Sequence, residues 1–316
     1  MTGLILRSSG RHAPGVSAPE QAGRPQLARL CRHLVVALIA LVTIGGATRV
    51  MEAGLACPDW PLCFGALLPA GQMNLRVFLE WFHRLDAGLV SGGLLLLAGA
   101  SWMSRRRGPS WLPWLASLAL LLVVVQAGLG ALTVTRLLRF DIVSAHLVTG
   151  LTLVALLSGL AEALAPPGPA AALDGPAPGP VARLLATVTL TLLMAQCLAG
   201  ALMATQWATG FCLHQGQACS WLHLHRGLAA PVALAGLATG AAVLRRGSVG
   251  RGRLLALLLA GTCLLQPLLG WLSLRLALDQ PLVTVTHQCT AALMVAVLAA
   301  LVVFLRPSPS EVPSRG

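Results

Sequence analysis

Residues 115–130 read Leu-Ala-Ser-Leu-Ala-Leu-Leu-Leu-Val-Val-Val-Gln-Ala-Gly-Leu-Gly, an apolar run with one amide side chain near its end. The run lies inside a longer stretch, 111–135, that contains no charged residue. A helix of about 20 such residues is long enough to cross the ~30 Å hydrocarbon core of a bilayer. The stretch therefore predicts a transmembrane helix.

Seven more stretches share this character. The chain of 316 residues is 56% hydrophobic and 10% charged, with a mean hydropathy of +0.79, which is more apolar surface than a soluble domain can bury. We predict an all-α integral membrane protein whose eight transmembrane helices occupy 33–51, 75–103, 111–135, 140–164, 183–206, 220–244, 254–275 and 282–305.

The basic residues, which are all arginines, indicate topology. The formal net charge is +12, but the arginines stand at the ends of apolar runs, which argues against a nucleic-acid partner. One side of the predicted membrane holds 15 of the 22: Arg7, Arg11, Arg24, Arg29, Arg32, Arg105, Arg106, Arg107, Arg183, Arg245, Arg246, Arg251, Arg253, Arg306 and Arg315. The positive-inside rule makes that side cytoplasmic and places both termini there.

An internal repeat divides the chain. Glutamine and glycine recur as Gln-x3-Gly in the third, fifth and seventh spans, and a histidine opens the span that follows each. We predict two four-helix bundles related as parallel repeats. The expected domains are a cytoplasmic tail (1–32), a first half (33–164), a Pro/Gly/Ala linker (165–182), a second half (183–306) and a cytoplasmic tail (307–316).

Each even-numbered span carries one histidine at a similar depth, about 8–12 Å below its outer start at 1.5 Å per residue. These are His83, His146, His225 and His287. Ionisable groups inside a membrane are costly, and two bis-histidine haem sites would account for all four. The alternative is four buried histidines that are hydrogen-bonded to neighbours.

In the second half, His223 competes with His225 as a ligand. We prefer His225 because His225-Arg226 repeats His83-Arg84, and each arginine could pair with a haem propionate. Glu80 stands three residues before His83 and shares its helix face. It is either a catalytic carboxylate beside the haem or a counter-charge for a neighbouring arginine, Arg84 or Arg76.

Two cysteine pairs lie in predicted outer loops, on the oxidising side of the membrane. They are Cys57 with Cys63, and Cys212 with Cys219. Short-range disulfides form readily in that environment, so we predict both pairs as disulfides. Their spacing does not distinguish structural bridges from redox-active ones.

The chain resembles the haem A synthase family, the cytochrome oxidase assembly proteins of bacteria and mitochondria. The similarity rests on Gly-Gly-Ala-Thr-Arg at 45–49, on Gly-Leu-Ala-Cys-Pro-Asp-Trp-Pro-Leu-Cys at 54–63, and on Glu80-x-x-His83-Arg84. The cysteine pairs match the bacterial, cysteine-containing branch, which implies a bacterial cytoplasmic membrane with the cysteine loops outside. The resemblance covers nearly the whole chain.

The resemblance implies a pair of four-helix bundles that oxidise the C8 methyl group of haem O to a formyl group, with water as the oxygen source. It implies that His83 and His146 flank the haem O substrate beside Glu80, and that His225 and His287 hold a haem b cofactor. The implied partners are the lipid bilayer, a haem O synthase, an electron acceptor and a second copy of the chain.

Two other classes of function remain open. A non-catalytic di-haem cytochrome that relays electrons from quinol would keep both haems and would not need Glu80. A quinone-linked thiol–disulfide oxidoreductase would work through the outer cysteines, but it would usually carry a Cys-x-x-Cys pair, which is missing here, and it leaves the four histidines unexplained.

Overall fold

The computed structural model describes residues 24–165, 180–204, 220–245, 250–276 and 280–306. Within these ranges, eight helices are long and apolar enough to cross a membrane. They are α2 (Arg24–Val50), α3 (Leu75–Met103), α4 (Leu112–Thr135), α5 (Phe140–Ala163), α6 (Pro180–Ala204), α8 (Ser220–Leu244), α9 (Gly250–Arg275) and α10 (Pro281–Phe304). The predicted all-helical membrane protein is confirmed.

The helices match the predicted spans, with differences at their ends. Helix α2 begins at Arg24 and α6 at Pro180, so both extend beyond the predicted apolar spans, which start at 33 and 183. The bounds of a helix are set by its backbone hydrogen bonds, which continue into polar residues. Hydropathy marks only the apolar part of the helix, which is stable in lipid. A 24-residue helix such as α4 is about 36 Å long at 1.5 Å per residue, enough to cross the core of a bilayer.

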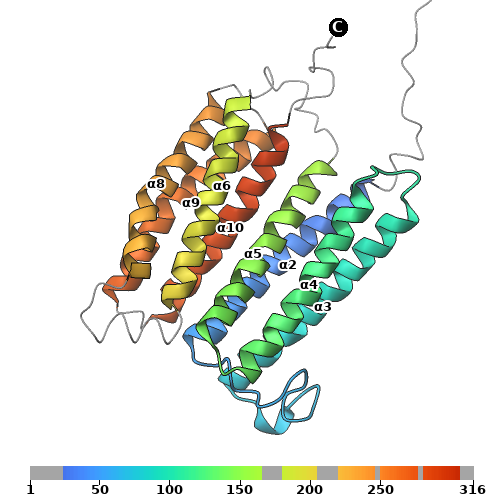
Figure 1. Cartoon of the computed structure of the whole chain (residues 1–316), viewed down its shortest axis with the longest axis vertical. Coiled ribbons are helices and arrows are strands. Elements are labelled where there is room, and N and C mark those ends of the chain that lie inside the picture. The colour runs from blue at the N-terminus through green and yellow to red at the C-terminus, as the bar shows by residue number, and fades with distance from the viewer. Residues whose placement is uncertain (1–23, 166–179, 205–219, 246–249, 277–279, 307–316) are drawn as a thin grey trace, which may run out of the picture.

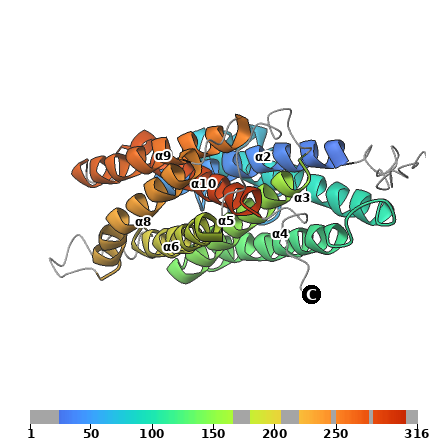
Figure 2. The ribbon, with the colours of Figure 1, turned by 90° about the horizontal axis from the view of Figure 1, so that it is seen from above.

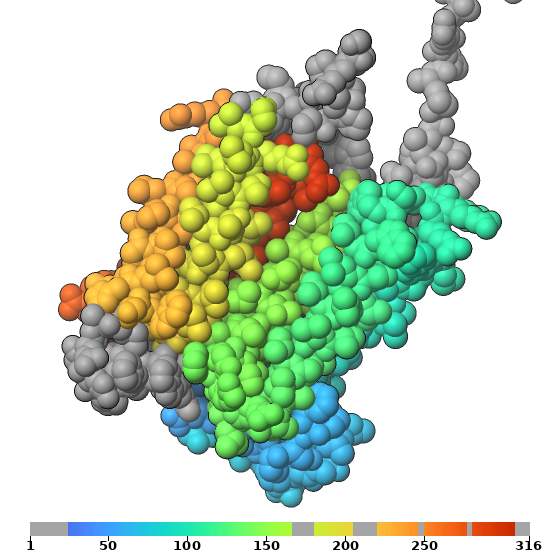
Figure 3. Space-filling model, in the orientation of Figure 1, coloured from blue at the N-terminus to red at the C-terminus, as the bar shows by residue number. Residues whose placement is uncertain are grey.

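The helices are arranged in two groups that lie side by side (Figures 1 and 2). In the first group α2 contacts α3 and α5, and α4 contacts α3 and α5. In the second, α6 contacts α8 and α10, and α9 contacts α8 and α10. Helix α10 also packs against α2 and α5, and the space-filling view shows the two groups touching near one end and separated by a hollow near the other, in which α10 is visible (Figure 3).

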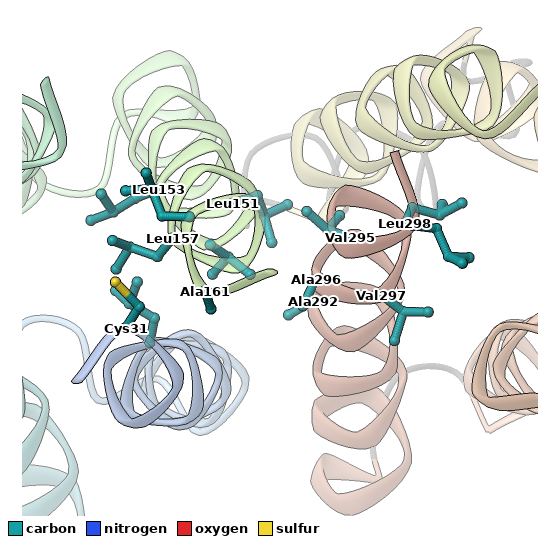
Figure 4. Packing of buried hydrophobic residues seen from close by; sticks show 14 of the residues in the cluster. Cys31, Leu151, Leu153, Leu157, Ala161, Ala292, Val295, Ala296, Val297 and Leu298 are labelled. Carbon is teal, nitrogen blue, oxygen red and sulfur yellow. The ribbon is translucent and has the colours of Figure 1, made fainter. Parts of the chain in front are cut away.

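The core lies where α5 and α10 meet. In the most apolar stretch of α10, 56% is buried inside the protein. The corresponding share in α4 is 17%. Leu151 of α5 and Val295 of α10 lie on facing sides of the two helices (Figure 4). The Ser158 hydroxyl donates to the Ala296 carbonyl at 2.6 Å, and small residues such as Ala296 allow this close approach.

The segment between α2 and α3 forms a compact loop that includes a short 3-10 helix, η1 (Ala70–Gln72). Cys57 and Cys63 form the predicted disulfide. Asn74 caps α3 by accepting hydrogen bonds from two backbone N–H groups in its first turn. The loop therefore joins the start of α3 as a fixed structure.

Asp59 holds the turn inside this loop. Its carboxylate accepts hydrogen bonds from the backbone N–H groups of Phe64 at 2.7 Å and Gly65 at 2.8 Å. These bonds lower the pKa of Asp59 below its ordinary value, and the bond from Gly65 makes the largest contribution. Gly65 has a φ of 71°, in the left-handed region that favours glycine.

Candidate functional site

Each of the four intramembrane histidines rests against a glycine of the preceding membrane helix. His83 of α3 stands over Gly45, His146 of α5 over Gly130, His225 of α8 over Gly200 and His287 of α10 over Gly270. A Cβ atom added at Gly200 would lie 2.8 Å from Cε1 of His225, and one at Gly45 would lie 2.9 Å from Cε1 of His83. At Gly200 and Gly45 the histidine ring therefore occupies space that a side chain would fill, whereas at Gly130 an added Cβ would make an ordinary contact of 3.4 Å.

The glutamines of the Gln-x3-Gly repeat hold the same histidines through their backbone. The side-chain amide of Gln126 donates to the carbonyl of His146 at 2.8 Å, and that of Gln266 donates to the carbonyl of His287 at 3.0 Å. Gln196 makes a longer bond of 3.5 Å to the carbonyl of His225. Glutamine and glycine, one helical turn apart, thus fix the height and the closeness of these three histidines, whereas Leu41 takes the place of the glutamine before Gly45.

In the second group, His225 and His287 face each other. Their ring centroids are 6.2 Å apart and the ring planes are at 81°. Metal–imidazole bonds are about 2 Å long, and the ring centre lies about 1 Å beyond the nitrogen, so a metal ion between two axial imidazoles requires centroids about 6 Å apart. The observed separation fits a haem iron ligated from both sides.

The hydrogen bonding of the ring nitrogens is consistent with haem ligation. Nδ1 of His225 lies 3.0 Å from the carbonyl oxygen of Gln196, a bond that leaves Nε2 available as a ligand. The backbone carbonyls of Leu41, Gln126 and Gln266 act on the buried rings of His83, His146 and His287 as that of Gln196 acts on His225.

The first group also contains two such histidines. His83 comes from α3 and His146 from α5, and each ring contacts a glycine of the preceding membrane helix. The described residues contain no cluster of three or more His, Cys, Asp or Glu side chains able to hold a metal ion. Haem requires only two protein ligands because the porphyrin supplies the other four, so paired histidines suit haem rather than a bare ion.

Glu80 lies under the disulfide loop and is buried, with 4% of its surface exposed. One carboxylate oxygen accepts the backbone N–H of Cys57 at 2.8 Å, and the other accepts Nη2 of Arg84 at 2.5 Å. Of the two arginines that the sequence offered as partners, Glu80 therefore pairs with Arg84. Arg76 instead forms an exposed pair with Glu52 at 3.8 Å.

Arg84 forms hydrogen bonds with the same loop. Its Nη1 donates to the carbonyl of Asp59 at 2.6 Å and to that of Leu62. The predicted propionate contact of Arg84 thus competes with Glu80 and two carbonyls for its donors. Within the described residues no ion pair involves Arg226, the second predicted contact. Cys212 and Cys219 lie outside the described residues.

A polar link between the two groups was not expected from the sequence. Arg49, in the last turn of α2, donates through Nη1 to the carbonyl of Ala204 at 2.5 Å and through Nη2 to Oε1 of Gln288 at 3.5 Å. Gln288 in turn donates to the carbonyl of Val42 at 2.9 Å. Gly46 makes room for this link, since a Cβ there would lie 2.8 Å from Oε1 of Gln288. The sequence signal for this link is an arginine three residues after two adjacent glycines.

A cavity of about 460 Å³ lies elsewhere, between α5, α6 and α10 and close to Arg306. The lining residues nearest to the histidines along their helices are Ala155, nine residues or about 13 Å beyond His146, and Ala299, 12 residues or about 18 Å beyond His287.

The fold and the site together define a class: a multi-pass membrane protein in which four histidines each contact a glycine of the preceding membrane helix. The chain belongs to the COX15-CtaA family, described as cytochrome oxidase assembly protein, whose family model matches residues 28–299.

Individual relatives agree with this family. The chain is 32% identical to the heme A synthase of Shewanella oneidensis over 42% of the chain and 44% of that protein, and 34% identical to the heme A synthase of Chelativorans sp. over 45% and 42%. These matches span less than half of the length of each relative. The heme A synthase of Sphingopyxis alaskensis is 28% identical and is matched over 93% of the chain and 96% of its own length.

Proposed function

We propose that this chain is a haem A synthase, an oxidoreductase that converts the C8 methyl group of haem O to a formyl group. Its family and its similarity to heme A synthases support this proposal. The observation that carries it is the ring pair of His225 and His287, whose 6.2 Å separation would suit two ligands of one haem iron. With water as the oxygen source, the oxidation of methyl to formyl releases four electrons and four protons, so the site must pass on electrons and accept protons.

In this proposal the two histidine pairs have different tasks. His83 and His146 hold haem O as substrate, and His225 and His287 hold a haem b cofactor. Haem b supplies one-electron transfer when bound. Contacts of α10 with α2 and α5 bring the two groups together, which supports electron transfer from the first pair to the second. The preference for His225 over His223 rests on the ring of His225 facing His287.

Glu80 is the proposed proton acceptor beside the substrate. It lies one helical turn before His83, and its burial keeps it out of bulk water. Its contacts with Arg84 and Cys57 also tie it to the disulfide loop, so the same carboxylate orients that loop over the substrate pair.

The topology and the partners complete the proposal. The two helix groups are parallel repeats with both termini cytoplasmic, and the cysteine loops, including a second disulfide between Cys212 and Cys219, face outward from a bacterial cytoplasmic membrane. The domain limits remain those expected from the sequence, with the tail and linker boundaries at 32, 164 and 182. The partners are a haem O synthase that delivers substrate, an electron acceptor and a second copy of the chain.

The test is pigment analysis of membranes from cells that make haem O. We expect haem A to accumulate with the parent chain and to fall at least tenfold with Glu80→Gln, because the amide can still accept from Cys57 but cannot take up a proton. Glu52→Gln is the matched control, since Glu52 forms the exposed pair with Arg76, and it should keep parental haem A levels.

Purified parent protein that carries haem b while no haem A forms would refute the synthase assignment. It would favour the electron-relay cytochrome, in which Glu80 serves only as the counter-charge of Arg84. Full haem A production by Glu80→Gln would remove the proton-acceptor role and leave the synthase assignment intact.

A further inference from the structure

Arg49 is a cation without a carboxylate partner among the described residues. The ion pairs of those residues join Arg76 to Glu52, Arg84 to Glu80, Arg139 to Asp141 and Arg251 to Glu162. The guanidinium of Arg49 contacts two neutral acceptors instead, the carbonyl oxygen of Ala204 and the amide oxygen of Gln288. Neutral oxygens solvate a cation inside a membrane protein but do not neutralise it.

The two acceptors place the guanidinium beside the second histidine pair. Ala204 lies one helical turn beyond Gly200, the residue that contacts His225, and Gln288 directly follows His287. Gln288 donates its amide N–H to Val42, which leaves its oxygen directed at Arg49. Although Arg49 belongs to α2 of the first group, it therefore reaches the ligand helices of the second group.

The donors of Arg49 are not all used. A guanidinium has five N–H donors in a planar fork, and the contacts to Ala204 and Gln288 use two of them. The free donors suit bidentate binding of a carboxylate, which arginine performs better than lysine. Haem carries two propionate carboxylates, so the proposed cofactor would supply the negative charge that Arg49 lacks among the described residues.

We infer that Arg49 binds a propionate carboxylate of the haem held by His225 and His287, so that the first helix group completes the cofactor site of the second. The inference rests on the proposed function. It assigns to Arg49 a role that the sequence suggested for Arg84 and Arg226. Arg84 already serves Glu80 and the disulfide loop.

A cation beside a haem stabilises the reduced, less positively charged iron and therefore raises its midpoint potential. The test is a potentiometric titration of the purified holoprotein. We expect Arg49→Gln to shift the haem b midpoint to lower potential while the optical and EPR signatures of bis-histidine ligation persist. Arg76→Gln, which removes an exposed arginine from the same face, should leave the midpoint unchanged.

A second measurement applies if Arg49→Gln does not accumulate. Arg49→Lys keeps the charge but loses the planar fork, so it should shift the propionate carboxylate bands in the redox-induced infrared difference spectrum. Parental bands in Arg49→Lys, or a parental midpoint in Arg49→Gln with full haem content, would overturn this inference alone. A parent protein that binds no haem b would overturn the proposed function as well.

Discussion

At the scale of single residues, glycine sets the place of each histidine. An intramembrane imidazole can lie between two helices only if the facing residue has no side chain at that height. Gly45, Gly130, Gly200 and Gly270 provide that space four times. The spacing between Cε1 and an added Cβ differs, from 2.8 Å at Gly200 to 3.4 Å at Gly130, so the four positions tolerate a methyl group to different extents.

Gly200→Ala should therefore disturb His225. A methyl group 2.8 Å from Cε1 forces the ring or the helix to move, and overpacking of this kind costs about 1–3 kcal/mol. We expect the haem b content of the purified protein, read from its absorbance, to fall by more than half. Gly261→Ala is the control, because an added Cβ there meets nothing within 4 Å. Equal haem content in the two variants would contradict the prediction.

At the scale of elements, the loop between α2 and α3 is held in three ways: by contacts from α3, by a turn of its own and by a disulfide. Glu80 and Arg84 bind its backbone from below, and Asp59 closes its turn from within. The disulfide between Cys57 and Cys63 spans the same segment. Because the contacts come from α3, the loop and the helix that carries His83 form one unit.

The turn should depend on pH through Asp59. Its carboxylate pKa is lowered in the folded protein, so the stabilisation is present above the unfolded value of 3.8 and is lost as the pH falls through the lower folded value. Hydrogen exchange of the Phe64 and Gly65 amides, corrected for intrinsic rates, should show protection that declines only in this acidic range. Asp59→Asn should reduce protection at neutral pH and remove its acid dependence. Unchanged protection at neutral pH would show that the carboxylate does not hold the turn.

At the scale of the whole molecule, α10 holds the two helix groups together. It contacts α2 and α5 of the first group as well as α6 and α9 of its own. Lipid is as apolar as leucine, so this association depends on close packing and on polar links such as Ser158 with Ala296 rather than on exclusion of water.

Leu298→Ala should test that packing. Leu298 is fully buried in α10, and its truncation leaves a cavity worth about 2 kcal/mol, at the low end of the range for soluble cores because no transfer from water is involved. Leu95→Ala on α3, where 61% of the side chain is exposed, is the matched control. Reversible unfolding in detergent should show destabilisation for Leu298→Ala and little for Leu95→Ala. Equal stability of the two variants would argue against α10 as the helix that holds the two groups together.

Much of the fold and part of the site could be predicted from the sequence. The spans follow from apolar runs such as 115–130, and the disulfide follows from Cys57 and Cys63 lying close in the chain. The sequence offers Glu80 two arginine partners, Arg84 and Arg76, and the structure pairs it with Arg84. Both arginines lie one turn from Glu80, so spacing alone could not decide between them.

The sequence by itself determined which segments are membrane helices, because the length of an apolar run and the thickness of a bilayer are local quantities. It also predicts a similar depth for the four histidines, since each stands a similar number of residues from the start of its span. Only the tertiary structure decided that His225 faces His287, and that Arg49 reaches Ala204 and Gln288, 155 and 239 residues away. Such contacts depend on how each helix is rotated against its neighbours, which side-chain packing over the whole molecule sets and no local pattern records.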